Sequence, residues 1–94
     1  MDSVTIDTAR ALVKTHAVNR AVIQCMEDGR RWTIIFRGQA EFILKSQRQN
    51  PKSFMKLETA VAEIQALGLR HAEIDFTKWK LSPVGTVKKN ERIS

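Results

Sequence analysis

Two short alternating runs between Gly29 and Lys45 constrain the fold of this chain more than any other feature. Every second position in each run is apolar, as expected for a strand with one buried face: first Trp32, Ile34 and Phe36, then Ala40, Phe42 and Leu44. Gly38-Gln39 separates the runs and is too short for a parallel crossover. The segment therefore predicts an antiparallel hairpin, with strands at residues 30–37 and 40–45.

Two more strands are expected, one on each side of this hairpin in the sequence. Residues 19–26 read as a strand that Glu27-Asp28-Gly29 joins to the hairpin, because Asp-Gly is a strong tight-turn signal. The three strands would then form an antiparallel meander. Residues 72–76 alternate between apolar and acidic side chains, which predicts a fourth strand at an edge of the sheet.

Two amphipathic helices complete the predicted fold. Residues 5–16 have apolar side chains at spacings of three and four, with Thr5 or Ser3 as the N-cap and His16 at the end of the buried face. Residues 57–67 repeat this pattern, and Gly68 stands where a left-handed C-terminal cap belongs. The second helix should cross the inner face of the meander. Whether the first helix covers the opposite face stays open.

The chain length sets the domain organisation. Ninety-four residues, 43% of them hydrophobic, suffice for one small domain with its own core. The predicted fold class is α+β in the order α-β-β-β-α-β, a three-stranded meander packed on an amphipathic helix with an additional edge strand. The domain is expected to span residues 1–76, and residues 77–94 to form a basic, flexible C-terminal tail.

Cysteine content and hydropathy indicate a cytoplasmic protein. Cys25 is the single cysteine, so no internal disulfide can form, which fits a reducing compartment. No apolar run reaches the roughly 18 residues needed to span a membrane. The acidic residues Asp2 and Asp7 stand where a secretory signal would carry lysines, so we expect neither export nor a membrane partner.

The net charge of +6 is concentrated in two segments. Residues 29–56 hold seven basic side chains against one acid, and residues 77–94 hold five against one. Segregated charge of this kind attracts polyanions and speeds encounter with them. The alternative is that lysine and arginine only keep a small domain soluble.

The residue types present argue against catalysis. His16, Cys25 and His71 lack the spacing of metal ligands, so no metal and no cofactor is expected. Cys25 alternates with Ile23 and is expected in the core. Glu73 and Asp75 fit exposed acids on one strand face better than an acid–base pair. The chain is therefore predicted not to be an enzyme.

Candidate binding residues are the basic, polar and aromatic side chains of the two basic segments. Arginine forks match phosphate oxygens and guanine edges, and threonine can donate to either. Trp79 lies between two lysines and could stack on a base or cap the core. Ile35 and Ile43 alternate with the charged positions and would be exposed, unless the first helix covers them. The predicted nucleic-acid-binding set is Arg30, Arg31, Thr33, Arg37, Lys45, Arg48, Lys52, Lys78, Trp79, Lys80, Lys88 and Lys89.

Several features resemble the ParC-type partition-associated proteins of bacterial plasmids and integrative elements. They are the Ala9-Arg10-x-Leu12-Val13-Lys14 stretch, Trp32 opening a strand, the Phe54-x-x-Leu57-Glu58-Thr59-Ala60 stretch, and Leu67-Gly68-Leu69 before Glu73-Ile74-Asp75. The resemblance covers roughly residues 9–76 and implies a role in the maintenance of a mobile element. It brings no site residues with it. The order of elements also resembles that of double-stranded-RNA-binding domains, but the loop and lysine motifs of that family are absent here. The strands resemble the integrase arm-binding sheets as well, and the binding arginines of those domains would correspond to Arg31 and Arg37.

Two functions are weighed. The first is a non-enzymatic, DNA-associated accessory protein that binds through the basic sheet face and tail, with phosphate contacts supplying most of the affinity. The second is a protein–protein interaction module, with a dimer as one form of it, that uses Ile35, Ile43 and a free sheet edge without binding nucleic acid.

Overall fold

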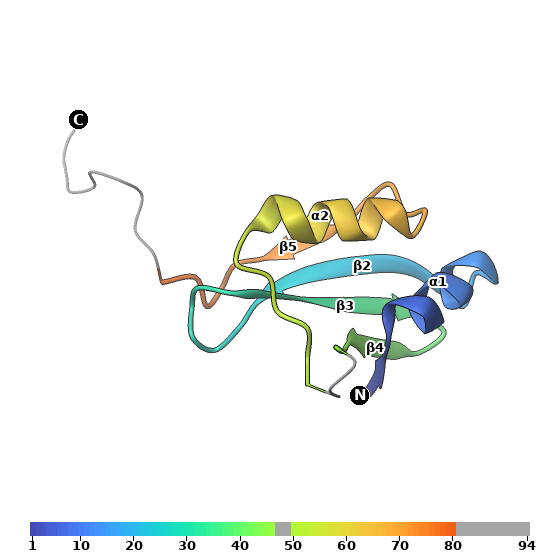
Figure 1. The fold of residues 1–94 in the computed structure, drawn as a ribbon, viewed down its shortest axis with the longest axis horizontal. Coiled ribbons are helices and arrows are strands. Elements are labelled where there is room, and N and C mark those ends of the chain that lie inside the picture. Colours follow the sequence, from blue (N-terminus) through green and yellow to red (C-terminus); the bar gives the residue numbers. More distant parts are fainter. Residues whose placement is uncertain (47–49, 81–94) are drawn as a thin grey trace.

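The computed structural model describes residues 1–46 and 50–80, and the predicted site residues Arg48, Lys88 and Lys89 lie outside this part. Seven elements follow one another along the chain: β1 (Asp2–Val4), α1 (Ile6–Lys14), β2 (Val18–Cys25), β3 (Trp32–Gly38), β4 (Glu41–Leu44), α2 (Leu57–Ala66) and β5 (Glu73–Asp75). The strands form one sheet in the order β1-β4-β3-β2-β5, with both helices packed against it (Figure 1). The predicted α+β class with an edge strand is confirmed.

The sheet is mixed in direction. Strands β2, β3 and β4 form the predicted antiparallel meander, with Val22 opposite Ile35 and Ile35 opposite Ile43. At the two margins β1 runs parallel to β4, and β5 runs parallel to β2. The sequence did not predict β1, because three residues are too few for a periodic pattern. Its pairing with β4 continues in a hydrogen bond from the Lys45 amide to the Val4 carbonyl, 2.8 Å long.

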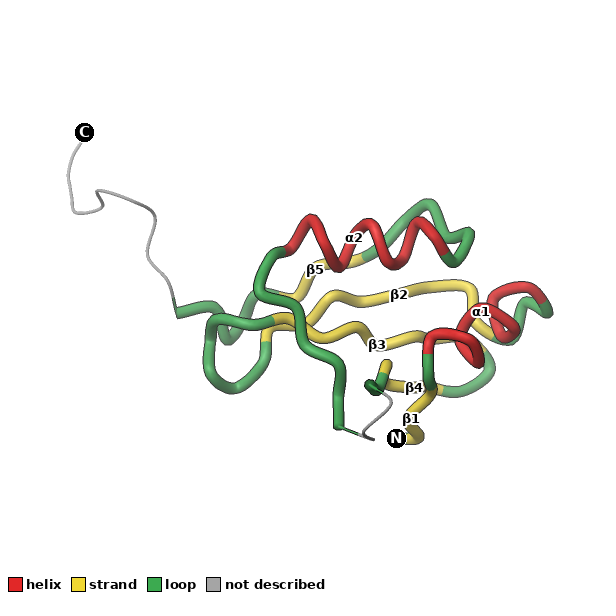
Figure 2. The backbone as a smooth tube through the Cα atoms, in the orientation of Figure 1, coloured by secondary structure: helices red, strands yellow, loops and turns green. Residues whose placement is uncertain are grey.

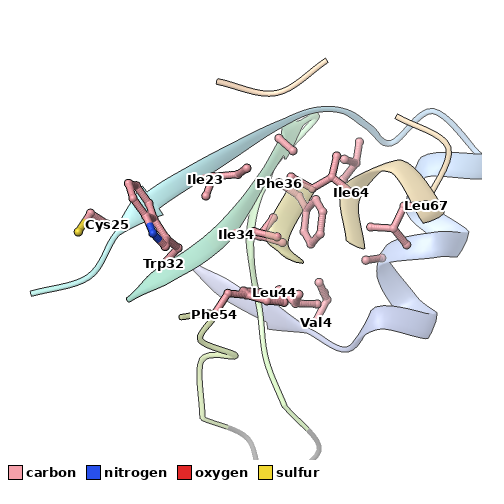
Figure 3. Packing of buried hydrophobic residues seen from close by; sticks show 14 residues of the cluster. Val4, Ile23, Cys25, Trp32, Ile34, Phe36, Leu44, Phe54, Ile64 and Leu67 are labelled. Atoms are coloured by element: carbon pink, nitrogen blue, oxygen red, sulfur yellow. The ribbon is translucent and has the colours of Figure 1, made fainter. Parts of the chain in front are cut away.

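The hydrophobic core lies between the sheet and both helices (Figure 3). Ile34 and Phe36 of β3 are fully buried, as is Ile23 of β2, and this confirms the predicted inner face. Helix α2 contributes Ala60 and Ile64, and α1 contributes Ala9. Trp32 is also buried, and Phe54 pairs with it through two backbone hydrogen bonds of 2.8 Å. The core therefore contains side chains from the sheet, from both helices and from the Phe54 segment.

The position of α1 settles the alternative that the sequence left open. Ala9 belongs to the same buried cluster as Ile34, and the half-buried Leu12 and Val13 pack against that cluster. Helix α1 thus covers the same face of the sheet as α2 and leaves the opposite face uncovered by either helix. His16 was predicted wrongly as the end of a buried helix face. The helix ends at Lys14, and His16 is an exposed residue with a φ of 63°.

The observed strand limits correct the sequence prediction at the turns. Strand β3 begins at Trp32, so Arg30 and Arg31 belong to the preceding turn and not to the sheet. Strand β4 begins at Glu41, and Ala40, predicted to point inward, is exposed in the turn. Helix α2 ends at Ala66 and is followed by Gly68 with a φ of 100°, as the sequence predicted.

The chain after β5 folds back onto the domain at first. Residues 77–80, which the sequence prediction assigned to a flexible tail, are held by contacts with the β2–β3 turn. The amide of Lys80 donates to the carbonyl of Gly29 at 3.1 Å, and Trp79 stacks on Trp32. The rest of the predicted tail, residues 81–94, lies outside the described residues. Within the described part, no helix is long and apolar enough to cross a membrane.

Candidate binding surfaces

The sheet face opposite the helices, called here the open face, is the surface on which the sequence placed the binding arginines. Three apolar residues lie in one row across its centre, since Val22, Ile35 and Ile43 pair directly on neighbouring strands. Val22 and Ile35 are each only 5% exposed, although both helices pack on the other face. The expectation that Ile35 is either exposed or beneath α1 is therefore wrong.

The polar groups of the open face are largely paired with one another. Arg37 lies opposite Glu41, and its Nε is 2.9 Å from the Glu41 carboxylate, an ion-pair contact without hydrogen-bond geometry. Arg20 lies 4.0 Å from Glu73 on the edge strand. Thr33 is buried, and its hydroxyl has no hydrogen-bond partner among the residues described. Of the predicted sheet residues, only Thr33 and Arg37 lie on this face within a strand.

Arg31 has a structural role in the β2–β3 turn. Its Nε donates to the Asp28 carboxylate at 2.6 Å, and the same carboxylate accepts the backbone amides of Arg30 and Arg31 at 2.9 and 3.0 Å. These backbone and side-chain donors lower the pKa of Asp28 to about 2. Gly29, with a φ of 72°, supplies the left-handed residue of the turn. Arg31 is therefore already engaged in the absence of any ligand.

The segment 77–80 adds two lysines to this turn. The Lys78 ammonium forms an ion pair with Glu27, which lowers the pKa of Glu27 and raises that of Lys78. Lys80 is attached through its backbone to Gly29, and among the residues described neither its ammonium nor the Arg30 guanidinium forms an ion pair. Tertiary packing thus gathers four predicted binding cations at one turn and pairs two of them with acids.

Two further predicted lysines lie elsewhere. Lys45 follows β4, and Lys52 bridges to Glu63 of α2 at 3.3 Å while its ammonium lies 5.5 Å from the centre of the Phe54 ring. Both line a shallow pocket beside Thr5 and Asp7 at the start of α1. The predicted site therefore divides into three groups with different surroundings: the open face, the β2–β3 turn and this pocket.

An apolar opening on the described surface was not predicted. A pocket of about 550 Å³, called here the α2–β5 groove, lies between the start of α2 and the end of β5. Its apolar side chains include Met55 and Phe76, which are 68% and 66% exposed, and Ile74, which is 43% exposed. Trp79 and Trp32, which stack on each other, also line it. The lining residues are Trp32, Met55, Lys56, Leu57, Glu58, Ile74, Phe76 and Trp79.

A second pocket continues along the same helix. It is lined by Val61, Ile64 and Gln65 of α2 and by the loop from Leu69 to Ala72 that leads into β5. Val61, which the sequence placed on the buried stripe of α2, is 46% exposed here. Helix α2 therefore leaves the inner face of β5 incompletely covered. A signal for this was present in the sequence, since the large apolar residues Phe76 and Trp79 follow the alternating run at residues 72–76 among polar neighbours.

The structure places two of the features considered for chemistry. Cys25 is buried, as predicted, and burial is the main cause that raises the pKa of its thiol. Among residues 1–46 and 50–80, no three His, Cys, Asp or Glu side chains are grouped as metal ligands would be. Comparisons with protein-family models, with curated proteins and with solved structures find no match for this chain.

Proposed function

We propose that this chain is a non-enzymatic accessory protein that acts as a protein-interaction module, with the α2–β5 groove as its binding surface. The observation that carries the proposal is the exposure of Met55, Ile74 and Phe76 around one apolar pocket. Contiguous exposed apolar surface beside polar residues marks interaction sites, whereas single exposed apolar residues are ordinary. The resemblance of residues 9–76 to ParC-type proteins supports placing such a module in the maintenance of a plasmid or mobile element.

Selection of displayed peptides tests this function directly. A phage-displayed library of random peptides would be selected on the wild-type chain and on a Met55→Ser/Phe76→Ser double variant. We expect peptides that bind the wild type and lose binding to the double variant. Val61→Ser is the matched control, because Val61 is 46% exposed and does not line the groove. Equal recovery on wild type and groove variant would refute the proposal.

DNA association is the second candidate, and one tertiary contact favours it. The Lys80–Gly29 hydrogen bond brings Lys80 beside Arg30, and the cations of Arg31 and Lys78 lie at the same turn. Phosphate neutralisation by such a cluster would be strongly salt-dependent. Arg31 is paired with Asp28, and Arg37 with Glu41. These ion pairs reduce the positive charge that the turn and the open face can offer to phosphate groups.

Fluorescence anisotropy with random-sequence duplex DNA at low and moderate salt tests this candidate. The Arg30→Ala/Lys80→Ala variant should bind more weakly and show a smaller dependence on salt. Arg10→Ala/Lys14→Ala on α1 removes the same charge from another element and should retain more of the affinity. Equal losses in both variants would mean that net charge alone attracts DNA, and no binding by the wild type would eliminate the candidate.

A further inference from the structure

Strand β5 is incomplete on two sides. It pairs with β2 alone among the described strands, so its other edge has no partner strand there. Figure 2 shows β5 beside β2. Its inner face is also open, because Ile74 and Phe76 line the α2–β5 groove and remain exposed. An edge strand presents unpaired N–H and C=O groups to any segment that can lie beside it. The unpaired backbone edge of β5 and the apolar α2–β5 groove are therefore contiguous.

The two faces of β5 have different chemistry. Ile74 pairs with Ile23 and shares the core-facing side of the sheet, whereas Glu73 and Asp75 pair with Val22 and Gln24 and share the open face. Glu73 is a largely exposed acid with Arg20 4.0 Å away. Asp75 accepts hydrogen bonds from the Thr77 hydroxyl and amide, which lower its pKa. The edge thus presents apolar side chains on one side and carboxylates on the other.

From this arrangement we propose that β5 accepts an extended segment of another protein as an added strand, one that alternates apolar and basic side chains. The apolar side chains would enter the α2–β5 groove beside Ile74 and Phe76. The basic side chains would lie on the open face beside Glu73 and Asp75, because opposite charges on neighbouring strands are stabilising. Strand addition of this kind draws affinity from the backbone and specificity from alternate side chains. This proposal rests on the proposed interaction function and names the partner class.

A second copy of this chain fits the edge poorly. A two-fold symmetric contact pairs β5 with itself in the antiparallel direction. A register centred on Ile74 places Glu73 opposite Asp75 of the other copy. The neighbouring registers that keep the faces aligned are centred on Glu73 or on Asp75, and each places that one acid opposite itself. Like charges directly opposite one another are destabilising. Charge complementarity therefore selects a basic partner strand over self-association.

Titration with synthetic peptides, followed in nitrogen–proton NMR spectra, tests the proposal. The probes are a short blocked peptide that alternates lysine and valine, its glutamate–valine counterpart, and a leucine–lysine peptide that forms an amphipathic helix. The lysine–valine peptide should shift the amide signals of Glu73, Ile74 and Asp75 and slow their hydrogen exchange. The glutamate–valine peptide should not. Glu73→Lys should weaken binding of the lysine–valine peptide roughly fivefold.

Asp2→Lys is the matched control, since it reverses an acid on β1, the strand at the other margin of the sheet. Binding of the lysine–valine peptide should be unchanged in this variant. Equal shifts with both strand peptides, no shift with either, or loss of binding in Asp2→Lys would each overturn the proposal. Binding of the helical peptide alone would overturn strand addition and leave the interaction function standing. The displayed-peptide selection judges that function independently.

Discussion

The indole ring of Trp79 stacks on that of Trp32, with ring centroids 5.0 Å apart and an angle of 22° between the planes. These residues are far apart in the sequence, and their contact attaches the segment after β5 to the start of β3. The Lys80–Gly29 hydrogen bond and the Lys78–Glu27 ion pair reinforce the same attachment. Both rings also line the α2–β5 groove, so the stack links the stability of the fold to the shape of the proposed binding surface.

Replacing Trp79 should therefore destabilise the domain. Trp79→Ala removes the stacked ring and part of the cover over Trp32, and we expect a loss of roughly 1–3 kcal/mol in the free energy of unfolding. Trp79→Phe keeps an aromatic ring and should lose less. Urea denaturation followed by circular dichroism measures both. A Trp79→Ala variant as stable as the wild type would mean that the stack does not hold this segment in solution.

The Asp28 turn should make stability depend on pH in the acidic range. The pKa of Asp28 in the folded protein is about 2, below the value of about 3.9 for an unperturbed aspartate. The folded state consequently binds fewer protons than the unfolded state between these values. The contribution is fully present above about pH 4 and is lost as the pH falls toward 2.

Asp28→Asn removes this titration and should flatten the change of stability across that pH range, as urea denaturation at several pH values would show. Asp2→Asn at an exposed position of β1 is the control for the loss of one acid. A wild type and Asp28→Asn variant with parallel pH profiles would contradict the assigned hydrogen bonds.

Two isoleucines on the core-facing side of the sheet test how completely the helices cover β3 and β5. Ile34 is fully buried under the helices, whereas Ile74 is 43% exposed in the α2–β5 groove. Ile34→Val should cost about 0.5–1.5 kcal/mol in the free energy of unfolding. Ile74→Val should cost less than about 0.5 kcal/mol. Thermal or urea denaturation distinguishes them, and equal costs would indicate that Ile74 is buried in solution by something that covers the groove.

Gly38 is required for space at the end of β3. A methyl group at this position would overlap with the Ala17 carbonyl oxygen, which accepts a hydrogen bond from the Gln39 amide. We expect Gly38→Ala to cost at least about 2 kcal/mol, because the obstructing atom belongs to the backbone and cannot rotate away. Urea denaturation measures this cost against that of the comparison variant.

The comparison variant is Gly68→Ala, for which the nearest obstructing side-chain atom is 4.0 Å away and the cost comes only from a φ of 100°. This variant should lose roughly 1–2 kcal/mol in the free energy of unfolding. A Gly38→Ala variant less destabilised than Gly68→Ala would mean that β2 and β3 do not approach each other this closely at Gly38.

Local sequence patterns predicted most elements of the fold. The alternation at Trp32, Ile34 and Phe36 identified the inner face of β3, and Gly68 marked the end of α2, because both signals depend on neighbouring residues alone. The same reasoning misplaced Arg31 in a strand, since the carboxylate of Asp28 extends the turn by two residues through hydrogen bonds. Strand β1 was missed because its pairing with β4 is formed between residues some forty positions apart.

The sequence by itself determined the α+β class, the meander, the buried face of the sheet and the segregation of charge. Tertiary structure alone decided that α1 shares a face with α2, that Arg31 and Arg37 are paired with acids, and that Trp79 stacks on Trp32. It also decided that α2 leaves β5 partly uncovered. The physical reason is that periodicity and turn chemistry are local, whereas the choice of face, charge partner and uncovered surface depends on how distant segments pack together.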